Sequence, residues 1–388
     1  MNESDNKKFI PYGHQWIDDS DIKEVVAVLK SDWLTQGPKV KEFEEALADY
    51  CEASYAVVFS SGTAALHAAY FSIGLEKNDE IITSPNTFVA TSNAAIFLGA
   101  KPVFVDIELD NGNINPDLIK DKITRNTKAI IPVHYSGHPV NLEKIHDIAE
   151  KHNLITVEDA THAIGAKYKK KKVGGLSTLT IFSFHPVKLI TTGEGGAVLT
   201  NDRDLFERLV MFRTHGITKN RDKFINLNEG SWYYEMQYLG NNYRMTDIQA
   251  ALGISQLKKL NKFIERRREI VNIYREAFGT NPYFEIPEEK EYAYSSWHLY
   301  PIRLKDRYKN IKRKVFSEMR KRGLGIQVHY IPVYWQPYYR KLGYDGEICT
   351  NAEDFYQREI SLPLYPSMNN EDIKYVIDTI FGVFKEFE

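Results

Sequence analysis

The sequence predicts an α/β protein, with a large domain built on a mostly parallel sheet flanked by helices and a smaller C-terminal α+β domain. Two observations support this fold class. Between about residues 55 and 215, short β-rich runs alternate with amphipathic stretches, which is the pattern of α/β units around a parallel sheet. From residue 246 onward, one long helical pattern is followed by strand-like runs and further helical patterns.

The elements of the large domain are expected in alternating order. Strands are predicted at 55–60, 79–84, 102–107, 128–133, 154–159, 179–184 and 196–201. Helices are predicted between them at 63–74, 91–98, 116–123 and 142–153. Sheets of this kind bind ligands beyond the carboxyl ends of their strands. We therefore expect the functional residues in the loops that follow the strands.

The rest of the chain indicates how the domains are divided. Residues 216–241 form a polar loop longer than an ordinary connection, which indicates a functional or interfacial role. A helix is expected at 246–278, followed by a strand at 297–304 and by helices at 314–323 and 370–387. We predict an N-terminal arm (1–34), a large domain (35–257) and a connecting helix with the small domain (258–388).

Charge and hydropathy exclude several classes of partner. Fifty Lys and Arg residues against 52 Asp and Glu give a formal charge of −2, so no global basic field attracts nucleic acid or an anionic membrane. The strongly basic run at 169–172 is typical of a solvated hairpin turn. The N-terminus is polar and lacks a signal-peptide pattern, and no apolar run is long enough to span a bilayer. We expect a cytoplasmic protein.

Disulfide and metal sites are not expected. Cys51 and Cys349 lie far apart, outside any CxxC pair or Cys/His cluster. His134 and His138 are four residues apart, but Gly137 lies between them and Pro139 follows. We therefore do not expect a helix that presents both histidines to a metal ion.

The stretch SFHPVKLITTGEGGAVLT (183–200) places Lys188 between two apolar runs, just before a glycine-rich turn. A buried ammonium group is costly unless the amine is neutral or covalently engaged. Lys188 is therefore either a surface lysine at a strand end or a group that takes part in chemistry.

Polar and aromatic residues follow three of the predicted strands. After the first strand, Gly62 and Thr63 begin a helix whose N-terminus suits a phosphate, although such residues also cap helices that bind nothing. After the second, Phe88 either stacks on a flat ring or packs in the core. After the fifth, Asp159 either holds a proton on a heteroaromatic nitrogen or caps a helix, and His162 follows it by three positions.

Taken together, these groups match one cofactor. They comprise a phosphate cradle, a stacking aromatic ring, a carboxylate for a pyridine nitrogen and a lysine for an aldehyde. Sites for pyridoxal 5′-phosphate pair a Schiff-base lysine with an acidic residue at the pyridinium nitrogen. The combined pattern favours a chemical role for Lys188.

Several motifs also carry a resemblance to a known family. They are SGTAAL (61–66), EDATHAIGA (158–166), SFHPVKLITTGEGGAVLTND (183–202), GNNYRMTDIQAALGISQL (240–257) and HYIPVY (329–334). Their combination resembles the DegT/DnrJ/EryC1/StrS family of pyridoxal phosphate-dependent sugar aminotransferases over essentially the whole chain. Two segments are most similar to aminotransferases of the pseudaminic acid pathway: FYQREISLPLY (355–365) and the sequence HPVKLITTGEGG around Lys188. Those enzymes aminate C4 of a UDP-linked 4-keto-6-deoxy hexosamine.

The resemblance implies a fold-type I enzyme and gives each motif residue a role. Lys188 would be joined covalently to the cofactor, and Asp159 would contact the pyridine nitrogen. His162 would lie against the ring or its phenolic oxygen, and Phe88 would stack on the ring.

The resemblance also implies a homodimer with shared active sites. Gly62, Thr63 and Ser183 would hold the phosphate, and Asn242 would reach the phosphate of the neighbouring subunit's cofactor. Asn241 replaces an aromatic residue often found at its position, which makes the contact of Asn242 harder to assign.

The implied activity is transfer of an amino group, with glutamate as the expected donor and a nucleotide keto sugar as the acceptor. A dehydratase of the same fold is a second reading, but related dehydratases have histidine where this chain has Lys188. We interpret the nearby His185 as structural. A non-enzymatic nucleotide-sugar sensor is the third reading, and the complete set of chemical groups argues against it.

Overall fold

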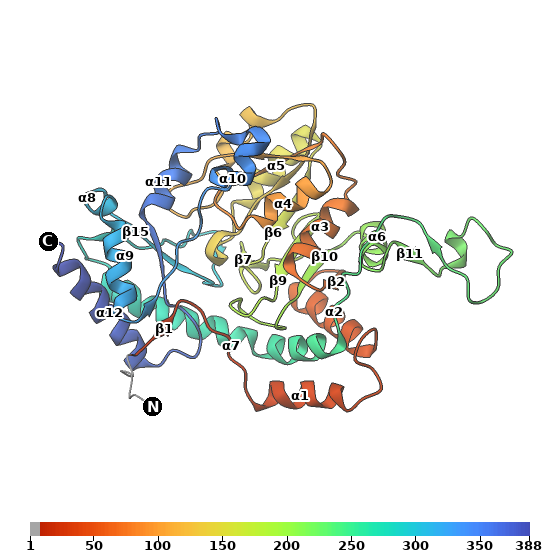
Figure 1. Cartoon of the computed structure of the whole chain (residues 1–388), viewed down its shortest axis with the longest axis horizontal. Helices are drawn as coiled ribbons and strands as arrows, with labels where there is room; N and C mark the ends of the chain where they lie inside the picture. Colours follow the sequence, from red (N-terminus) through yellow and green to blue (C-terminus); the bar gives the residue numbers. More distant parts are fainter. Residues whose placement is uncertain (1–7) are drawn as a thin grey trace.

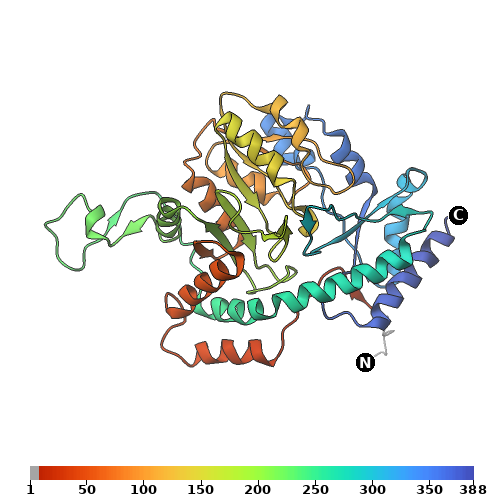
Figure 2. The ribbon, with the colours of Figure 1, turned by 180° about the vertical axis from the view of Figure 1, so that it is seen from behind.

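The computed structural model describes residues 8–388, so the start of the predicted N-terminal arm lies outside the described residues. The predicted fold class is confirmed: a large, mostly parallel sheet lies between layers of helices, and a smaller α+β unit follows at the C-terminal end (Figures 1 and 2). No helix within residues 8–388 is both long and apolar enough to cross a membrane.

The main sheet contains seven strands in the order β2-β10-β9-β6-β5-β3-β4. Strand β10 runs antiparallel to β2 and β9, whereas the pairs from β9 to β4 are parallel. All the strands predicted for the large domain are present, and their bounds are β2 (Tyr55–Phe59), β3 (Glu80–Thr83), β4 (Lys101–Phe104), β5 (Thr127–Ile131), β6 (Ile155–Asp159), β9 (Leu179–Ser183) and β10 (Gly196–Thr200).

Helices bury both faces of this sheet. Along β2, Val57 and Phe59 pack against α3, α4 and α6, whereas Ala56 and Val58 pack on the other face with α2 and α7. Successive side chains of a strand point to opposite faces, so a strand covered on both sides needs a continuous apolar run. The helices are α2 (Pro38–Cys51), α3 (Gly62–Ser72), α4 (Ala90–Phe97), α5 (Leu142–His152), α6 (Arg203–Arg213) and α7 (Asp247–Phe278).

The helix predicted at 116–123 is wrong. The segment forms two 3-10 turns, Pro116–Leu118 and Lys120–Lys122. Ile123 already has an extended backbone, with φ −73° and ψ 128°, because the chain turns there toward β5. Too few residues remain for a stable α-helical nucleus.

The C-terminal unit has its own three-stranded antiparallel sheet, β13-β15-β17. Helices α9 and α12 and the second half of α7 enclose its apolar core. Its elements are β13 (Phe284–Glu285), β15 (Tyr300–Leu304), α9 (Lys312–Lys321), β17 (Glu359–Leu362) and α12 (Asn370–Lys385). Helix α7 runs unbroken through residue 257, and the division of the chain at that residue stays a prediction.

The segment between the small-domain elements α9 and β17 returns to the large domain. Its aromatic residues Tyr334 and Phe355 join Phe104 and Tyr135 in one buried cluster. Helix α11 (Thr350–Arg358) ends this segment and leads directly into β17.

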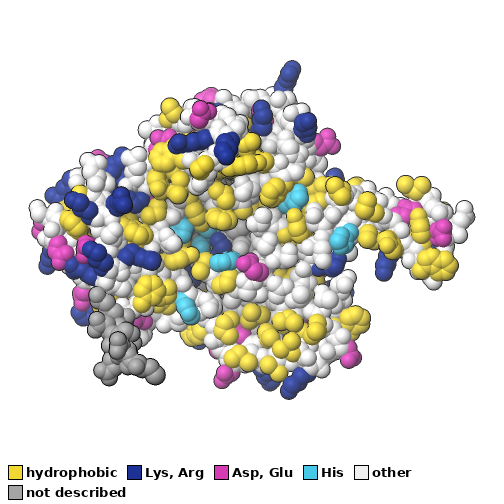
Figure 3. All heavy atoms as spheres, viewed as in Figure 1, with side chains coloured by type: hydrophobic (Ala, Val, Ile, Leu, Met, Phe, Trp, Pro, Cys, Tyr) yellow, Lys and Arg dark blue, Asp and Glu magenta, His cyan; other side chains and the backbone are white. Residues whose placement is uncertain are grey.

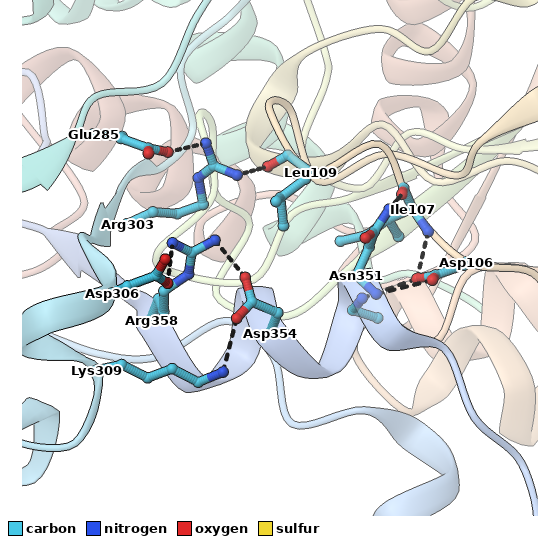
Figure 4. A network of polar contacts seen from close by, with 11 residues as sticks. Asp106, Ile107, Leu109, Glu285, Arg303, Asp306, Lys309, Asn351, Asp354 and Arg358 are labelled. Atoms are coloured by element: carbon cyan, nitrogen blue, oxygen red, sulfur yellow. Dashed lines mark hydrogen bonds and ion pairs between the residues drawn. The ribbon is translucent and has the colours of Figure 1, made fainter.

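Polar contacts fix α11 in place (Figure 4). The backbone N–H of Asn351 donates to Asp106 of the large domain at 2.9 Å. At the other end of the helix, Arg358 pairs with Asp354 and with Asp306, the latter at 3.2 Å. The start of β17 is therefore held between the two domains.

Two exposed features lie away from the core. The hairpin of β11 (Ile217–Thr218) and β12 (Glu235–Met236) projects far from the body (Figures 1 and 2), and Ile225 and Trp232 on it are 90% and 76% exposed. Helix α1 (Asp19–Leu29) also leaves apolar side chains exposed along the lower edge of Figure 3. Exposed apolar patches of this kind mark interaction surfaces.

Candidate active site

A cavity of about 430 Å³ lies beyond the carboxyl ends of β2, β6 and β9, where ligands were expected. Histidine side chains lie beside a hollow on this side of the molecule (Figure 3). The residues that line the cavity are Tyr12, Ser61, Gly62, Thr63, Leu66, Phe88, Ala90, Thr91, Asp159, Thr161, Ser183, His185, Val187, Lys188, Glu194, His329 and Tyr330. Most of the residues selected from the sequence therefore meet in one cavity.

One end of the cavity is the N-terminus of α3. Ser61 caps this helix by accepting a hydrogen bond from the N–H of Ala64 at 3.1 Å, and the exposed Thr63 lies in its first turn. Ser183, at the end of β9, lies directly opposite: a Cβ added to Gly62 would come within 3.1 Å of the Ser183 hydroxyl. Free backbone N–H groups, the helix dipole and two hydroxyl groups make this end suitable for a phosphate.

Asp159 lies at the end of β6 and is 3% exposed. Its Oδ2 accepts a hydrogen bond from the Thr91 hydroxyl at 2.6 Å, and its Oδ1 accepts the N–H of Thr161 at 3.2 Å. No α-helix begins after β6, so the alternative role as a helix cap does not apply. Two donors orient this carboxylate at the base of the cavity.

Lys188 lies in the loop between β9 and β10 and is half-buried. Burial lowers the pKa of its amine to about 8, although the Asp159 carboxylate favours the charged form. Lys188 can therefore lose its proton much more readily than a lysine on the surface. This is the property that a nucleophilic or basic lysine requires.

His162 lies behind the lining of the cavity and is 4% exposed. Its Nε2 is 3.1 Å from the Tyr330 hydroxyl, and its buried Nδ1 has no partner within the described part of the chain. Burial first, and then the charge of Lys188, lowers the pKa of His162 well below its ordinary value, so the ring is neutral.

Two expected residues lie near the cavity mouth or outside the cavity. Phe88 is 60% exposed, with its ring centre 6.3 Å from that of Tyr330, so the alternative of core packing does not apply. Asn242 is exposed, pairs with Thr214 and does not line the cavity of its own chain.

His185, which we interpreted as structural, lies in the lining of the cavity. Its side chain is exposed and lines the cavity, because the loop turns at this residue as it leaves β9. The backbone N–H of His185 donates to the Ser183 hydroxyl at 3.4 Å.

Sequence reasoning missed several lining residues. Thr91 binds Asp159, and Tyr12, His329 and Tyr330 form one wall. Strand β1 (Ile10–Pro11) pairs with β16 (Leu324–Gly325), which brings Tyr12 beside His329 with ring centres 5.4 Å apart. The motif HYIPVY contains His329 and Tyr330. It indicates the family, but no local pattern in it places either residue in the cavity.

Comparisons with known proteins give a consistent result. The model of the DegT/DnrJ/EryC1/StrS aminotransferase family matches residues 15–381. The UDP-4-amino-4,6-dideoxy-N-acetyl-beta-L-altrosamine transaminase of Campylobacter jejuni (strain 81-176) is 44% identical over 381 residues, which cover 97% of this chain and 98% of the relative.

Two solved structures are also similar over the whole chain. Helicobacter pylori PseC, an aminotransferase involved in the biosynthesis of pseudoaminic acid, superimposes with a TM-score of 0.92 at 38% identity, covering 98% of this chain and 100% of PseC. The PLP form of Spr1654 from Streptococcus pneumoniae, which is named as a sugar aminotransferase, gives a TM-score of 0.90 at 31% identity, covering 98% and 100%.

Proposed function

The chain belongs to the DegT/DnrJ/EryC1/StrS aminotransferase family, and from this premise we propose that it uses pyridoxal 5′-phosphate to aminate a nucleotide-linked keto sugar. The proposed acceptor position is C4 of a UDP-4-keto-6-deoxy-N-acetylhexosamine of pseudaminic acid biosynthesis, and the proposed donor is glutamate. One observation carries the proposal: the amine of Lys188, the carboxylate of Asp159 and the N-terminus of α3 meet in one cavity.

The groups around the cavity fit the cofactor. Gly62, Thr63 and Ser183 offer backbone N–H and hydroxyl donors for a phosphate. At the base of the cavity, the Asp159 carboxylate accepts hydrogen bonds and can pair with a protonated ring nitrogen. When bound, pyridoxal phosphate supplies an aldehyde that takes up an amino group and a ring that accepts electrons.

The chain's own residues then have distinct tasks. Lys188 would hold the cofactor covalently and, as a neutral amine, would move a proton, which its lowered pKa favours. Asp159 keeps the ring nitrogen protonated, and Thr91 keeps that carboxylate in place. Phe88 at the cavity mouth would cover the ring, and the unpaired Nδ1 of His162 would face the ring or its phenolic oxygen from behind the cavity lining. We assign catalysis to Lys188 and Asp159.

Support for the sugar substrate comes from the relatives. The Campylobacter jejuni protein is named for a UDP-linked 4-amino-4,6-dideoxy sugar, and PseC for pseudoaminic acid biosynthesis. Residues around the cavity must then admit an amino acid and a nucleotide sugar in turn. The cytoplasmic location stays a prediction from the sequence.

The experiment that tests this function is an assay of the purified enzyme with glutamate and a panel of nucleotide keto sugars. We expect release of 2-oxoglutarate in step with formation of an amino sugar, whose amine NMR locates at C4. Loss of a hydroxyl group without 2-oxoglutarate release would identify a dehydratase instead. Binding of the sugar without any product would identify a sensor.

We further propose a homodimer in which Asn242 serves the neighbouring subunit's phosphate site. The exposure of Asn242 outside its own cavity and the projecting hairpin of β11 and β12 support this arrangement. Cofactor binding and dimer formation should then strengthen each other by the same factor, because linkage is reciprocal.

Subunit mixing tests the shared site. In a dimer of one Lys188→Ala chain and one Asn242→Ala chain, both defects fall in one site and the other site is wild-type. Activity should therefore rise on mixing above the average of the two parent proteins. An unchanged average after verified subunit exchange would show that Asn242 serves its own chain.

A further inference from the structure

Three side chains hold His329 in the wall of the cavity. Its backbone N–H donates to Glu359 Oε2 at 2.8 Å, and its backbone carbonyl accepts the hydroxyl of Tyr135 at 2.7 Å. Its ring Nδ1 is 2.8 Å from the hydroxyl oxygen of Ser361. The position and the orientation of the imidazole are both fixed.

The two partners on β17 come from the alternation of a strand. Ile360 and Leu362 belong to the apolar core of the small domain. Glu359 and Ser361 are directed to the other face, as the two-residue period requires, and both contact His329 there. The small domain thus supplies the support for a residue of the cavity.

The hydrogen bonds determine which ring nitrogen carries the proton. Above the pKa of Glu359, which is about 7, the carboxylate is ionised and is an acceptor only, so the Ser361 hydroxyl donates to Glu359 Oε1, at 2.5 Å. Its single proton is then used, and the Ser361 oxygen can only accept from His329 Nδ1. Burial and the nearby charge of Lys188 lower the pKa of His329 to about 3, so the ring is neutral. The proton therefore lies on Nδ1, and Nε2 is unprotonated.

The other nitrogen is available to the cavity. His329 lines it together with Lys188 and Tyr330, and Nε2 has no hydrogen-bond partner among the residues the structure describes. An unprotonated imidazole nitrogen accepts a hydrogen bond but cannot donate one. The wall thus presents a fixed acceptor.

Glu359 has an environment that is unfavourable for a carboxylate. It is fully buried, and burial raises its pKa to about 7 although the charge of Lys312 and its hydrogen bonds act in the opposite direction. An apolar side chain in such a position often costs less free energy than a buried charge. A specific task for Glu359 explains why the carboxylate is present.

We propose that Glu359 and Ser361 are positioning residues that hold His329 as its Nδ1–H tautomer, so that Nε2 accepts a hydrogen bond from a hydroxyl or amino group of the substrate. This inference rests on the proposed function only for the identity of that substrate. The tautomer itself is a property of the protein alone.

An isosteric change should reverse the tautomer. In Glu359→Gln, the amide oxygen is needed by the His329 backbone N–H, so the amide NH₂ group faces Ser361 and donates to its oxygen. The Ser361 hydroxyl is then free to donate to His329 Nδ1, which gives its buried proton an acceptor, and we expect the ring proton to move to Nε2. The substitution keeps the shape of the side chain, and Lys312 keeps its hydrogen bond to the backbone carbonyl of Tyr356, so the fold should be retained.

Nitrogen NMR of ¹⁵N-histidine-labelled protein measures this directly, without cofactor and at a pH well above the Glu359 pKa of about 7. The His329 signals are identified by their loss in His329→Gln. We expect protonated Nδ1 in the wild type and in Ser72→Ala, a control that removes a buried serine hydroxyl bonded within α3. We expect protonated Nε2 in Glu359→Gln. Protonated Nε2 in the wild type, or an unchanged tautomer in Glu359→Gln, would overturn the proposal.

Kinetics give a second, separate test. Ser361→Ala should lower kcat/KM for the keto sugar about tenfold, as expected for one hydrogen bond in the reacting complex, whereas Ser361→Thr, which keeps the hydroxyl, should recover most of it. Equal losses in both variants would indicate packing and would overturn the role in positioning. If Glu359→Gln reverses the tautomer but the wild-type protein transaminates no sugar, the proposed function is refuted and the positioning of His329 is not.

Discussion

The base and the wall of the cavity differ in how they are built and in the groups they carry. The base consists of α3 and the carboxyl ends of β6 and β9, and it presents the anion site, Asp159 and Lys188. The wall consists of Tyr12, His329 and Tyr330, which come from segments tied to the small domain. Burial keeps the wall neutral, because it lowers the pKa of His329 to about 3 and raises that of Tyr330.

This difference suggests a division of labour. Groups that react or carry charge lie at the carboxyl end of the buried sheet, in the helix start and loop that follow its strands. Neutral donors and acceptors lie on the segment that the small domain supports, where they can orient the substrate. Substitutions at the base should therefore remove chemistry, and substitutions in the wall should change its efficiency.

The largest effect is expected at the base for Lys188→Ala. The residue supplies both the attachment of the cofactor and a proton carrier, so turnover should fall by more than the roughly 10²–10⁴-fold typical of a single general base. Steady-state assay measures the loss, and circular dichroism should show an unchanged fold. The exposed Lys314→Ala on α9 is the control. More than about a tenth of wild-type activity in Lys188→Ala would remove Lys188 from the mechanism.

Asp159→Asn should have the next largest effect. A neutral amide cannot keep a proton on the ring nitrogen, so we expect bound cofactor but a kcat lower by roughly 10²–10⁴-fold. Single-turnover kinetics and the visible absorbance of the protein measure the two properties. Asp147→Asn, on the exposed face of α5, should behave as the wild type. A nearly normal rate in Asp159→Asn would show that Asp159 has no catalytic role and only supports the turn through its contact with Thr161.

The pKa of Lys188 gives a prediction for the cofactor-free protein. Because an amine reacts in its neutral form, labelling of Lys188 should rise with pH and level off above about 8, whereas surface lysines continue to rise toward their ordinary pKa of 10.5. The shift of 2.5 units (10.5 − 8) makes the neutral fraction near neutral pH larger by about two orders of magnitude. Mass spectrometry after brief labelling with an amine reagent follows each lysine. Parallel profiles for Lys188 and surface lysines would contradict its lowered pKa.

The smallest effect is expected in the wall, for Tyr330→Phe. The change removes the hydroxyl that contacts His162 Nε2 and keeps the backbone bond from Tyr330 N–H to Asn86. Loss of one hydrogen bond should lower kcat/KM by about tenfold or less and leave the labelling of Lys188 unchanged. Tyr375→Phe, which removes a remote hydroxyl bonded to the Arg322 carbonyl, is the matched control. A loss as large as that of Asp159→Asn would end the distinction between base and wall.

The base could be predicted from the sequence because each of its groups lies next to the strand that positions it. Gly62, Asp159 and Lys188 follow apolar runs that form strands, and parallel strands bring their carboxyl ends to one edge. Local patterns therefore predicted the sheet, and most of the residues selected from the sequence line the cavity, although many of the lining residues were not among them. The helix predicted at 116–123 failed where a turn toward the next strand outweighed the apolar spacing.

The wall could not be predicted in the same way, because distant segments build it. Tyr12 reaches the cavity through pairing of β1 with β16, more than three hundred residues later in the chain. His329 is fixed by Glu359 and Ser361 on a strand that the sequence pattern did not reveal. No local periodicity records such contacts. The roles assigned to the site residues stay predictions for the experiments above.

The measurement that tests the central claim most directly is the site of covalent cofactor attachment. Purified protein is mixed with pyridoxal phosphate, reduced with borohydride and digested, and mass spectrometry locates the modified lysine. We predict visible absorbance before reduction and one dominant modification at Lys188, which is absent from Lys188→Ala. Modification spread over surface lysines, or the same modification pattern in Lys188→Ala, would contradict the assignment of this cavity as an aminotransferase active site.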